Sequence, residues 1–295
     1  MSVVNTLSGA TAKSAATSAS PATTPAATPA TTPAKVPLKV HSTIISKILS
    51  GFKNNKNPLQ PTKEQVNELK YNIQTSNFLR SLTPYKWGQI LDKHKDLLFI
   101  GKSKSKISDQ EDRAEQLAQR ILANPKIKTL ILMDGHGRFL LTLIKKLGLR
   151  ANHLSITVVD INSTVVEWHK YFFPKNVESK EDNIFNYEPS ETQIVYMNFC
   201  GIGGLKGQQA FANYLAKIKK SPSYTKELFV SFSTARRACY ASKGVSRPIH
   251  ERADQWLLLN AYPEDTWLSN IAKPYVAQKL FNGPQNNFPT FLLKF

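Results

Sequence analysis

The stretch LILMDGHGRFLLTLIKKLG, residues 130–148, decides the fold class. Its apolar start, Leu130 to Met133, has the length of a buried strand, and the apolar residues from Phe139 to Leu147 recur at helical spacing. Gly135 and Gly137 are therefore predicted to form a turn between a strand and a helix. Such a turn can hold a phosphate, the edge of a nucleotide or no ligand at all, so its role has to be judged from the rest of the chain.

Short apolar strands alternate with longer amphipathic helices from residue 129 onward. The predicted strands, in chain order, are TLILMD, SITVVDI, TQIVYMNF, ELFVSFS, YVAQKLF and FPTFLLKF. This alternation predicts an α/β fold with a doubly wound, mostly parallel sheet. No helix is expected between the last two strands, and a hairpin there would make the last strand antiparallel.

The sequence before this region divides into two parts. Residues 1–36 are almost entirely Ala, Thr, Ser and Pro, and we expect a disordered basic tail, because so little apolar surface cannot offset the entropy of ordering. Residues 37–124 show helical patterns, notably in STIISKILSGF and from Asp109 to Leu122, where Ser108 is the expected helix cap. We therefore predict a helical N-terminal region at 37–124 and a Rossmann-like domain at 125–295.

The charge balance points to a polyanionic partner. The chain has 39 Lys and Arg residues against 21 Asp and Glu, a formal net charge of +18. Such an excess attracts nucleic acid through the release of counterions. Docking on other acidic surfaces is the alternative. The tail would serve as a loose nucleic-acid tether, with an organelle transit peptide as the alternative interpretation.

The cysteine, histidine and apolar content indicates an intracellular protein with neither a metal nor a membrane span. Cys200 and Cys239 make neither a disulfide framework nor a metal cluster, and the six histidines lack ligand spacing. The sequence has no run of about 18 apolar residues, so it predicts no membrane-spanning helix. We therefore expect a reducing compartment and a site without metal.

Polar or small residues follow four of the predicted strands, at the edge where an open parallel sheet binds its ligands. They are Asp134-Gly135-His136-Gly137, Asp160-Ile161-Asn162, Asn198-Phe199-Cys200-Gly201 and Ser231-Phe232-Ser233. In their order and position, over roughly residues 125–295, these ends resemble the class I S-adenosylmethionine-dependent methyltransferases. The resemblance implies a Rossmann-like fold with S-adenosylmethionine as the cofactor.

The glycine turn matches the family in part. Asp134, Gly135 and Gly137 look like the acidic residue and the glycine-rich turn that let the backbone approach the methionine part of the cofactor. The family spacing is acidic-x-Gly-x-Gly, whereas His136 and Arg138 stand at its two glycine positions here. The exact pose of a cofactor on this turn is therefore not implied.

Further cofactor-binding residues follow from the resemblance. Asp160 looks like the acidic residue that accepts hydrogen bonds from both ribose hydroxyls, a task that suits a carboxylate. Asp182 and Asn183 are similar to the residues that read the adenine amino group after the third strand. The alternatives are a helix cap at Asp160 and a solvated loop at Asp182.

Asn198 is the candidate catalytic residue. In methyltransferases that act on amino groups of bases, an Asp or Asn followed by Pro-Pro and an aromatic accepts the amine protons. Asn198-Phe199 resembles this motif in the amide and the aromatic, but Cys200-Gly201 replace the prolines. A structural amide is the alternative. Cys200 is a candidate thiolate nucleophile toward a pyrimidine, or else a small buried thiol.

A basic segment, STARRACYASKGVSRPIHER, follows the strand ELFVSFS. Arg236, Arg237 and Arg247 are candidates for binding phosphate, and Tyr240 for stacking on an unpaired base. A solvated basic loop is the alternative.

Together these features predict methyl transfer from S-adenosylmethionine to a nucleic acid, RNA or DNA. The alternative is a methyltransferase-like subunit that has lost catalysis and binds nucleic acid or has a structural role. The altered glycine spacing and the missing prolines favour this alternative. An NAD-dependent enzyme would use the same turn and Asp160, but the three-glycine fingerprint is incomplete. A partner subunit that completes the site stays an open alternative.

Overall fold

The computed structural model describes residues 36–54, 60–102, 104–199, 205–220, 226–232, 276–279 and 290–295. The residues from Val36 onward form one compact unit. The predicted N-terminal tail, up to residue 35, lies outside the described residues.

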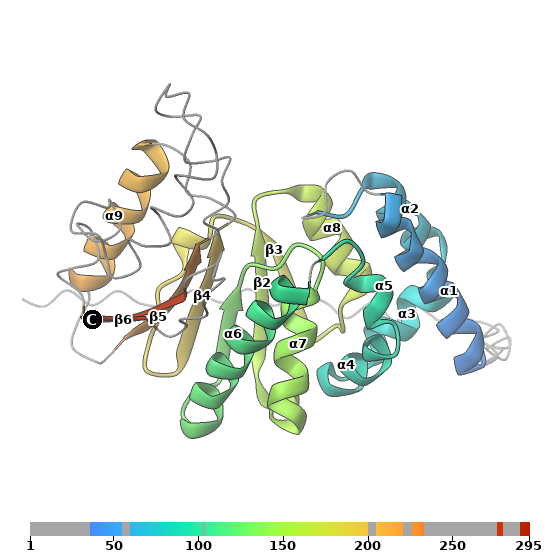
Figure 1. Cartoon of the computed structure of the whole chain (residues 1–295), viewed down its shortest axis with the longest axis horizontal. Coiled ribbons are helices and arrows are strands. Elements are labelled where there is room, and N and C mark those ends of the chain that lie inside the picture. The colour runs from blue at the N-terminus through green and yellow to red at the C-terminus, as the bar shows by residue number, and fades with distance from the viewer. Residues whose placement is uncertain are drawn as a thin grey trace, which may run out of the picture. The chain divides into compact units, whose positions relative to one another are not determined.

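Helices come first in this unit and then alternate with strands (Figure 1). The α-helices are α1 (Leu38–Ser50), α2 (Lys63–Tyr71), α3 (Ile73–Ser81), α4 (Pro84–Asp92), α5 (Lys95–Leu98), α6 (Lys104–Ala123), α7 (Arg138–Leu147), α8 (Ser163–Phe172) and α9 (Leu205–Lys220). Short 3-10 helices are η1 (Gly51–Asn54), η2 (Gly148–His153) and η3 (Ile184–Asn186). The strands are β1 (Thr129–Leu132), β2 (Ser155–Asp160), β3 (Val177–Glu181), β4 (Gln193–Phe199), β5 (Glu227–Phe232), β6 (Val276–Lys279) and β7 (Thr290–Lys294).

The described strands form one sheet in the order β3-β2-β1-β4-β5-β7-β6. Pairing is parallel from β3 across to β5, whereas β7 is antiparallel to both β5 and β6. This confirms the predicted α/β fold with a mostly parallel sheet and an antiparallel last strand. The chain moves outward from β1 to β3 and then returns to β4 on the other side of β1. The strand order therefore reverses between β1 and β4, where doubly wound sheets bind their ligands.

The strand β3 is absent from the predicted strands. Its sequence, VESKE, has one buried residue, Val177, and four half-buried or exposed ones. It lies at the edge of the sheet and pairs with β2 through the backbone, from Ile156↔Val177 to Asp160↔Glu181. A polar edge strand lacks the apolar pattern that sequence analysis detects.

The helix α6 begins at Lys104, so the predicted start at Ser108 was wrong. Ser108 lies inside the helix. The predicted apolar face is present, because Ala114, Leu117 and Ile121 are all buried. Packing of this face stabilises the helix.

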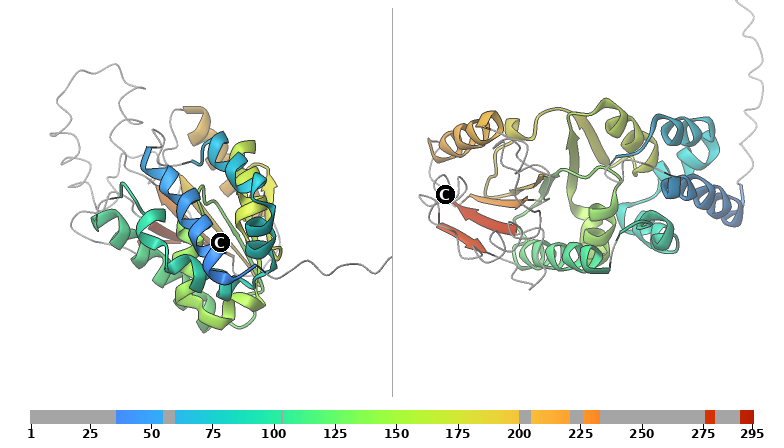
Figure 2. Two further views of the ribbon diagram at one scale, coloured as in Figure 1. Left: turned by 90° about the vertical axis from the view of Figure 1, so that its right-hand side faces the viewer. Right: turned by 45° about the horizontal axis from the view of Figure 1, so that its top comes forward.

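Alternate side chains of the strands enter two apolar layers. Leu132 and Tyr196 pack into the layer that holds the N-terminal helices, α6, α7 and α8. Val195 and Met197 pack into the layer that holds α9. The right panel of Figure 2 shows α6 and α9 on opposite sides of the sheet.

The N-terminal helices belong to the first of these layers. Trp87 of α4 is fully buried, and its indole N–H donates a 2.8 Å hydrogen bond to the carbonyl oxygen of Phe172, the last residue of α8. Lys70 of α2 forms an ion pair of 2.9 Å with Glu167 of α8. Figure 1 shows α1 to α5 gathered beside α7 and α8. The predicted domain boundaries stay predictions.

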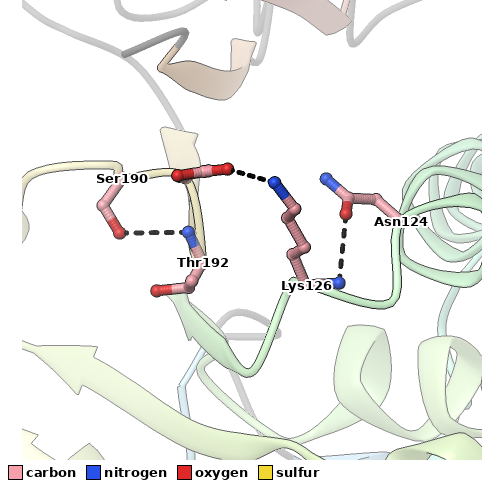
Figure 3. A network of polar contacts seen from close by, with 5 residues as sticks. Asn124, Lys126, Ser190 and Thr192 are labelled. Atoms are coloured by element: carbon pink, nitrogen blue, oxygen red, sulfur yellow. Dashed lines mark hydrogen bonds and ion pairs between the residues drawn. The ribbon is translucent and has the colours of Figure 1, made fainter. Parts of the chain in front are cut away.

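Loop contacts join the entries to β1 and β4 at the amino-terminal edge of the sheet (Figure 3). Asn124 Oδ1 accepts a 3.1 Å hydrogen bond from the Lys126 N–H, and Ser190 Oγ accepts one of 3.4 Å from the Thr192 N–H. Lys126 also forms an ion pair of 2.6 Å with Glu191. Asp134, Asp160 and Asn198 lie at the opposite, carboxyl edge.

Candidate functional site

The register of the sheet aligns three candidate side chains across the switch point. Leu132 of β1 pairs with Val158 of β2 on one side and with Tyr196 of β4 on the other. The residues two places further along the three chains are Asp134, Asp160 and Asn198. The sheet therefore brings together, at one edge, the ends of three strands that sequence analysis selected.

Asp134 closes the turn between β1 and α7. It is 7% exposed, and its Oδ2 accepts a 2.7 Å hydrogen bond from the Leu140 N–H. Burial raises the pKa of Asp134 to about 6, against the lowering effects of backbone hydrogen bonds from Leu140 and Gly137 and of the charges on Lys102 and Arg138. The carboxylate thus holds the turn to the first residues of α7, and its role toward a cofactor stays a prediction.

The two glycines of the turn lie against His169 of α8 and against Phe173, the residue that follows α8. Gly137 is the N-cap of α7 and has a left-handed conformation, φ +84° and ψ 11°. A Cβ atom there would lie 2.5 Å from Cε1 of Phe173, so a side chain is excluded by space as well as by φ. The carbonyl oxygen of Gly135 lies 3.2 Å from Nε2 of His169.

The residues that depart from the family spacing face the N-terminal helices. His136 is 2% exposed, and its ring meets that of Phe52 edge-on, with centroids 4.6 Å apart. Burial holds the pKa of His136 well below its usual range, and the positive charges of Arg138 and Lys102 lower it further. Arg138 is 4% exposed and donates a 2.5 Å hydrogen bond from Nε to the Leu98 carbonyl oxygen. Both side chains therefore extend from the turn to the N-terminal helices.

Asp160 lies half-buried at the end of β2. Its Oδ1 accepts a 2.8 Å hydrogen bond from the Asn162 N–H. Burial raises the pKa of Asp160, while backbone hydrogen bonds from Asn162 and Ile161 lower it. The helix cap of α8 is Asn162, whose Oδ1 accepts from the Thr164 N–H, so Asp160 is not the cap. The neighbouring Ile161 is 77% exposed, and Asn162 Nδ2 donates a 2.9 Å hydrogen bond to Oε1 of Gln60.

Asp182 and Asn183 lie beside this strand end. The Asp182 N–H donates to the carbonyl oxygen of Asp160 at 3.1 Å. Its carboxylate Oδ1 accepts from the Asn183 N–H at 2.7 Å and from Asn186 Nδ2 at 2.6 Å, and these bonds lower the pKa of Asp182. Asn183 Oδ1 accepts from the Phe185 N–H and caps η3. Both side chains thus shape their own loop, and their roles toward adenine stay predictions.

Asn198 is half-buried near the end of β4, in register with Ser231 of β5. Its amide oxygen Oδ1 is buried and has no hydrogen-bond donor among the residues that the structure describes. A buried carbonyl oxygen without a donor is costly unless another group binds it, so such atoms occur at functional sites. This oxygen is suited to accept a hydrogen bond from a ligand N–H.

Several predicted residues lie outside the described residues. They are the substrate-binding candidates Arg236, Arg237, Tyr240 and Arg247, and the two cysteines, Cys200 and Cys239. The chain nonetheless enters the basic segment from the end of β5, which lies beside Asn198.

Within the described ranges, no three His, Cys, Asp or Glu side chains are grouped so that they could hold a metal ion. None of the helices in those ranges combines the length and the apolar character needed to cross a bilayer.

The structure adds residues that sequence analysis did not select for a role. His169 contacts the carbonyl of Gly135, and Gln60 contacts the Asn162 cap. A histidine on the apolar face of a helix has the sequence signature of an ordinary core residue, and Gln60 stands in a loop, so neither carries a local signal. His136 and Arg138 did carry one, since they interrupt the glycine spacing.

No family model and no curated protein matches the chain. Solved structures that resemble it include the plantazolicin methyltransferase BpumL in complex with SAH and a triazolic desmethylPZN analog, with 16% identity over 79% of this chain and 99% of that chain, and a TM-score of 0.41. The O-methyltransferase from Bacillus cereus in complex with SAH has 10% identity, covers 76% and 96%, and has a TM-score of 0.36. The N-methyltransferase NodS from Bradyrhizobium japonicum WM9 has 10% identity, covers 63% and 95%, and has a TM-score of 0.35. These likenesses concern the fold alone.

The sheet itself carries the assignment of the fold. Its order reverses between β1 and β4, its last strand is antiparallel, and a glycine turn and acidic strand ends lie at the switch point. These features agree with the resemblance that the sequence indicated, and the chain has a doubly wound, Rossmann-like α/β fold.

Proposed function

We propose that the protein transfers a methyl group from S-adenosylmethionine to an amino group of a nucleic acid. The observation that carries this proposal is the buried Oδ1 of Asn198, which has no hydrogen-bond partner among the described residues and lies at the switch point, level with Asp134 and Asp160 in the sheet.

The side chains at the switch point fit the cofactor. Gly137, which has no room for a Cβ, leaves the turn as bare backbone, and Asp160 offers a half-exposed carboxylate beside the exposed Ile161. A carboxylate accepts two hydrogen bonds from neighbouring hydroxyls, as on a ribose. When bound, S-adenosylmethionine supplies an electrophilic methyl group on a sulfonium sulfur.

Asn198 would orient the acceptor. Its Oδ1 accepts a hydrogen bond from an N–H of the acceptor amine, which aims the nitrogen lone pair away from the amide and toward the methyl carbon. The nitrogen held by Asn198 would accept the methyl group that the bound nucleotide would supply, and the proton that the nitrogen loses would pass to solvent.

Nucleic acid is the proposed acceptor because of charge and position. The net charge of +18 favours a polyanion, and the segment with Arg236, Arg237, Tyr240 and Arg247 leaves the end of β5 beside Asn198. Guanidinium groups suit phosphate, and the tyrosine suits a splayed base.

A subunit that binds nucleic acid without catalysis is the second candidate. The observation that favours it is the pair of buried side chains, His136 and Arg138, in place of two glycines of the family turn. A cofactor titration separates the two candidates.

The test is calorimetric titration of the full chain with S-adenosylmethionine and with S-adenosylhomocysteine, beside an NAD control. We expect micromolar binding of both methionine nucleotides, lost in Asp160→Ala and kept in Glu191→Ala. Glu191 is a matched control because it is a carboxylate at the opposite edge of the sheet. A folded wild type that binds neither nucleotide would overturn the methyl-transfer proposal in favour of the second candidate.

The acceptor is tested with a radiolabelled methyl group and four substrates: structured RNA, single-stranded DNA, duplex DNA and a basic-peptide mixture. Label in RNA or DNA supports the proposal. Label in peptide alone would contradict the nucleic-acid acceptor while leaving methyl transfer intact.

A further inference from the structure

The side chains of α8 hold both glycines of the turn from the same direction. His169 and Phe173 are four residues apart, so they lie on one face of α8 and its continuation. Their rings stack with centroids 4.6 Å apart and planes inclined by 17°. His169 contacts the Gly135 carbonyl, and Phe173 fills the space where Gly137 would carry a Cβ.

The tautomer of His169 follows from its surroundings. The residue is 1% exposed, and burial lowers its pKa to about 4, against backbone hydrogen bonds with Asp134 and Gly135 that raise it. The ring is therefore neutral at physiological pH. A carbonyl oxygen can only accept, so Nε2 carries the hydrogen and donates to Gly135. Nδ1 is buried without a hydrogen-bond partner among the described residues.

This hydrogen bond fixes the orientation of a whole peptide group. The peptide between Gly135 and His136 is planar and trans, so its N–H points opposite to its carbonyl. With the carbonyl turned to α8, the His136 N–H is directed away from that helix. A glycine has little conformational preference of its own, so the hydrogen bond from His169 helps to hold this peptide group in one orientation.

The other side of the turn is held by the N-terminal helices. The His136 ring packs on Phe52, and Arg138 donates to Leu98. The turn is therefore clamped between α8 and the N-terminal helices, and His169 supplies the hydrogen bond on the α8 side.

We propose that His169 is a positioning residue for the methionine end of S-adenosylmethionine, which it serves by locking the Gly135–His136 peptide with its N–H turned away from α8. This inference rests on the proposed function, because it assumes that the turn binds that nucleotide. His169 itself does not touch the ligand; it decides which backbone groups the turn presents.

The test compares three variants in the full chain. His169→Phe keeps a buried ring on Phe173 and removes the donor. His169→Gln keeps a side-chain N–H that can donate. Trp168→Phe is the matched control, because Trp168 is a neighbouring, fully buried aromatic whose indole N–H has no hydrogen-bond partner among the described residues.

Each variant is titrated with S-adenosylhomocysteine after its melting temperature has been measured. We expect binding to weaken ~10- to 100-fold in His169→Phe, as for other residues that orient a binding group, with partial recovery in His169→Gln and little change in Trp168→Phe. A folded His169→Phe with wild-type affinity would overturn the positioning role, even if its melting temperature fell.

Two further results complete the test. Nitrogen-15 NMR of the free protein should find His169 neutral, with the hydrogen on Nε2, from pH 5 to 8; a hydrogen on Nδ1 contradicts the inference. If the wild type binds no methionine nucleotide, the proposed function falls and the role of His169 falls with it. If the wild type binds S-adenosylhomocysteine and His169→Phe binds it equally well, only the positioning role is overturned and the proposed function stands.

Discussion

Arg138, the first residue of α7, donates a 2.5 Å hydrogen bond from Nε to the carbonyl oxygen of Leu98, the last residue of α5. The guanidinium is 5.7 Å from the centre of the Phe52 ring and lies close enough to Asp134 for their charges to interact. One side chain thus joins the N-terminal helices to the glycine turn. Burial lowers the pKa of Arg138 to about 10, so it stays charged at neutral pH.

Arg138→Met should destabilise the protein. The substitution keeps an apolar stem but leaves the buried Leu98 carbonyl without its donor, at a cost of about 1–3 kcal/mol in the free energy of unfolding. Urea denaturation measures this. Lys145→Met is the control on the same helix: Lys145 forms an exposed ion pair of 2.8 Å with Asp92, worth about 0–1 kcal/mol. Equal losses in the two variants would contradict the clamping role of Arg138.

Asp134 should make the stability depend on pH. Its pKa is about 6 in the folded protein, above the usual 3.8, so folding favours the protonated carboxyl. The resulting stabilisation is complete below about pH 4 and is lost as the pH rises through 6, amounting to roughly 3 kcal/mol. The stability of wild type relative to Asp134→Asn should therefore fall between pH 4 and 7. Denaturation curves across this range that run parallel for the two proteins would show that Asp134 has an ordinary pKa.

Gly137→Ala should cost more than the same change at Gly101. Both glycines have positive φ, +84° and +76°, so both pay a backbone cost of about 1 kcal/mol or more. Only at Gly137 would the new methyl meet a neighbour, Phe173, at 2.5 Å, whereas nothing lies within 4 Å at Gly101. The double variant Gly137→Ala, Phe173→Leu should have a higher free energy of unfolding than Gly137→Ala alone, because the smaller leucine makes room for the new methyl group. Equal costs at the two glycines would rule out the contact with Phe173 as the reason for glycine.

Asn198→Ala should separate catalysis from cofactor binding, given the proposed function. Loss of the oxygen that orients the acceptor should lower kcat by roughly 100-fold, with the affinity for S-adenosylhomocysteine unchanged. Gln193→Ala is the control at the other end of β4, where Nε2 donates to the Glu188 carbonyl, and it should leave kcat unchanged. Unchanged kcat in Asn198→Ala would assign Asn198 a structural role.

Much of the fold could be predicted from the sequence because the strands β1, β2, β4 and β5 are short apolar runs. Burial on both faces of a parallel sheet demands such runs, and helical periodicity separates them clearly. The edge strand β3 escaped detection because its one buried residue, Val177, gives no pattern. The start of α6 was misplaced because the residues from Lys104 to Ser108, which also belong to the helix, show no apolar pattern.

The candidate site divides in the same way. The sequence by itself determined which polar residues lie at or just after the strand ends, among them Asp134, Asp160 and Asn198, because strand ends follow from local apolar patterns. Only the tertiary structure decided that these ends are level, that His136 and Arg138 face the N-terminal helices, and that His169 holds Gly135. Those contacts join residues more than thirty positions apart, and no local pattern encodes a pairing that depends on how separate helices pack on one sheet.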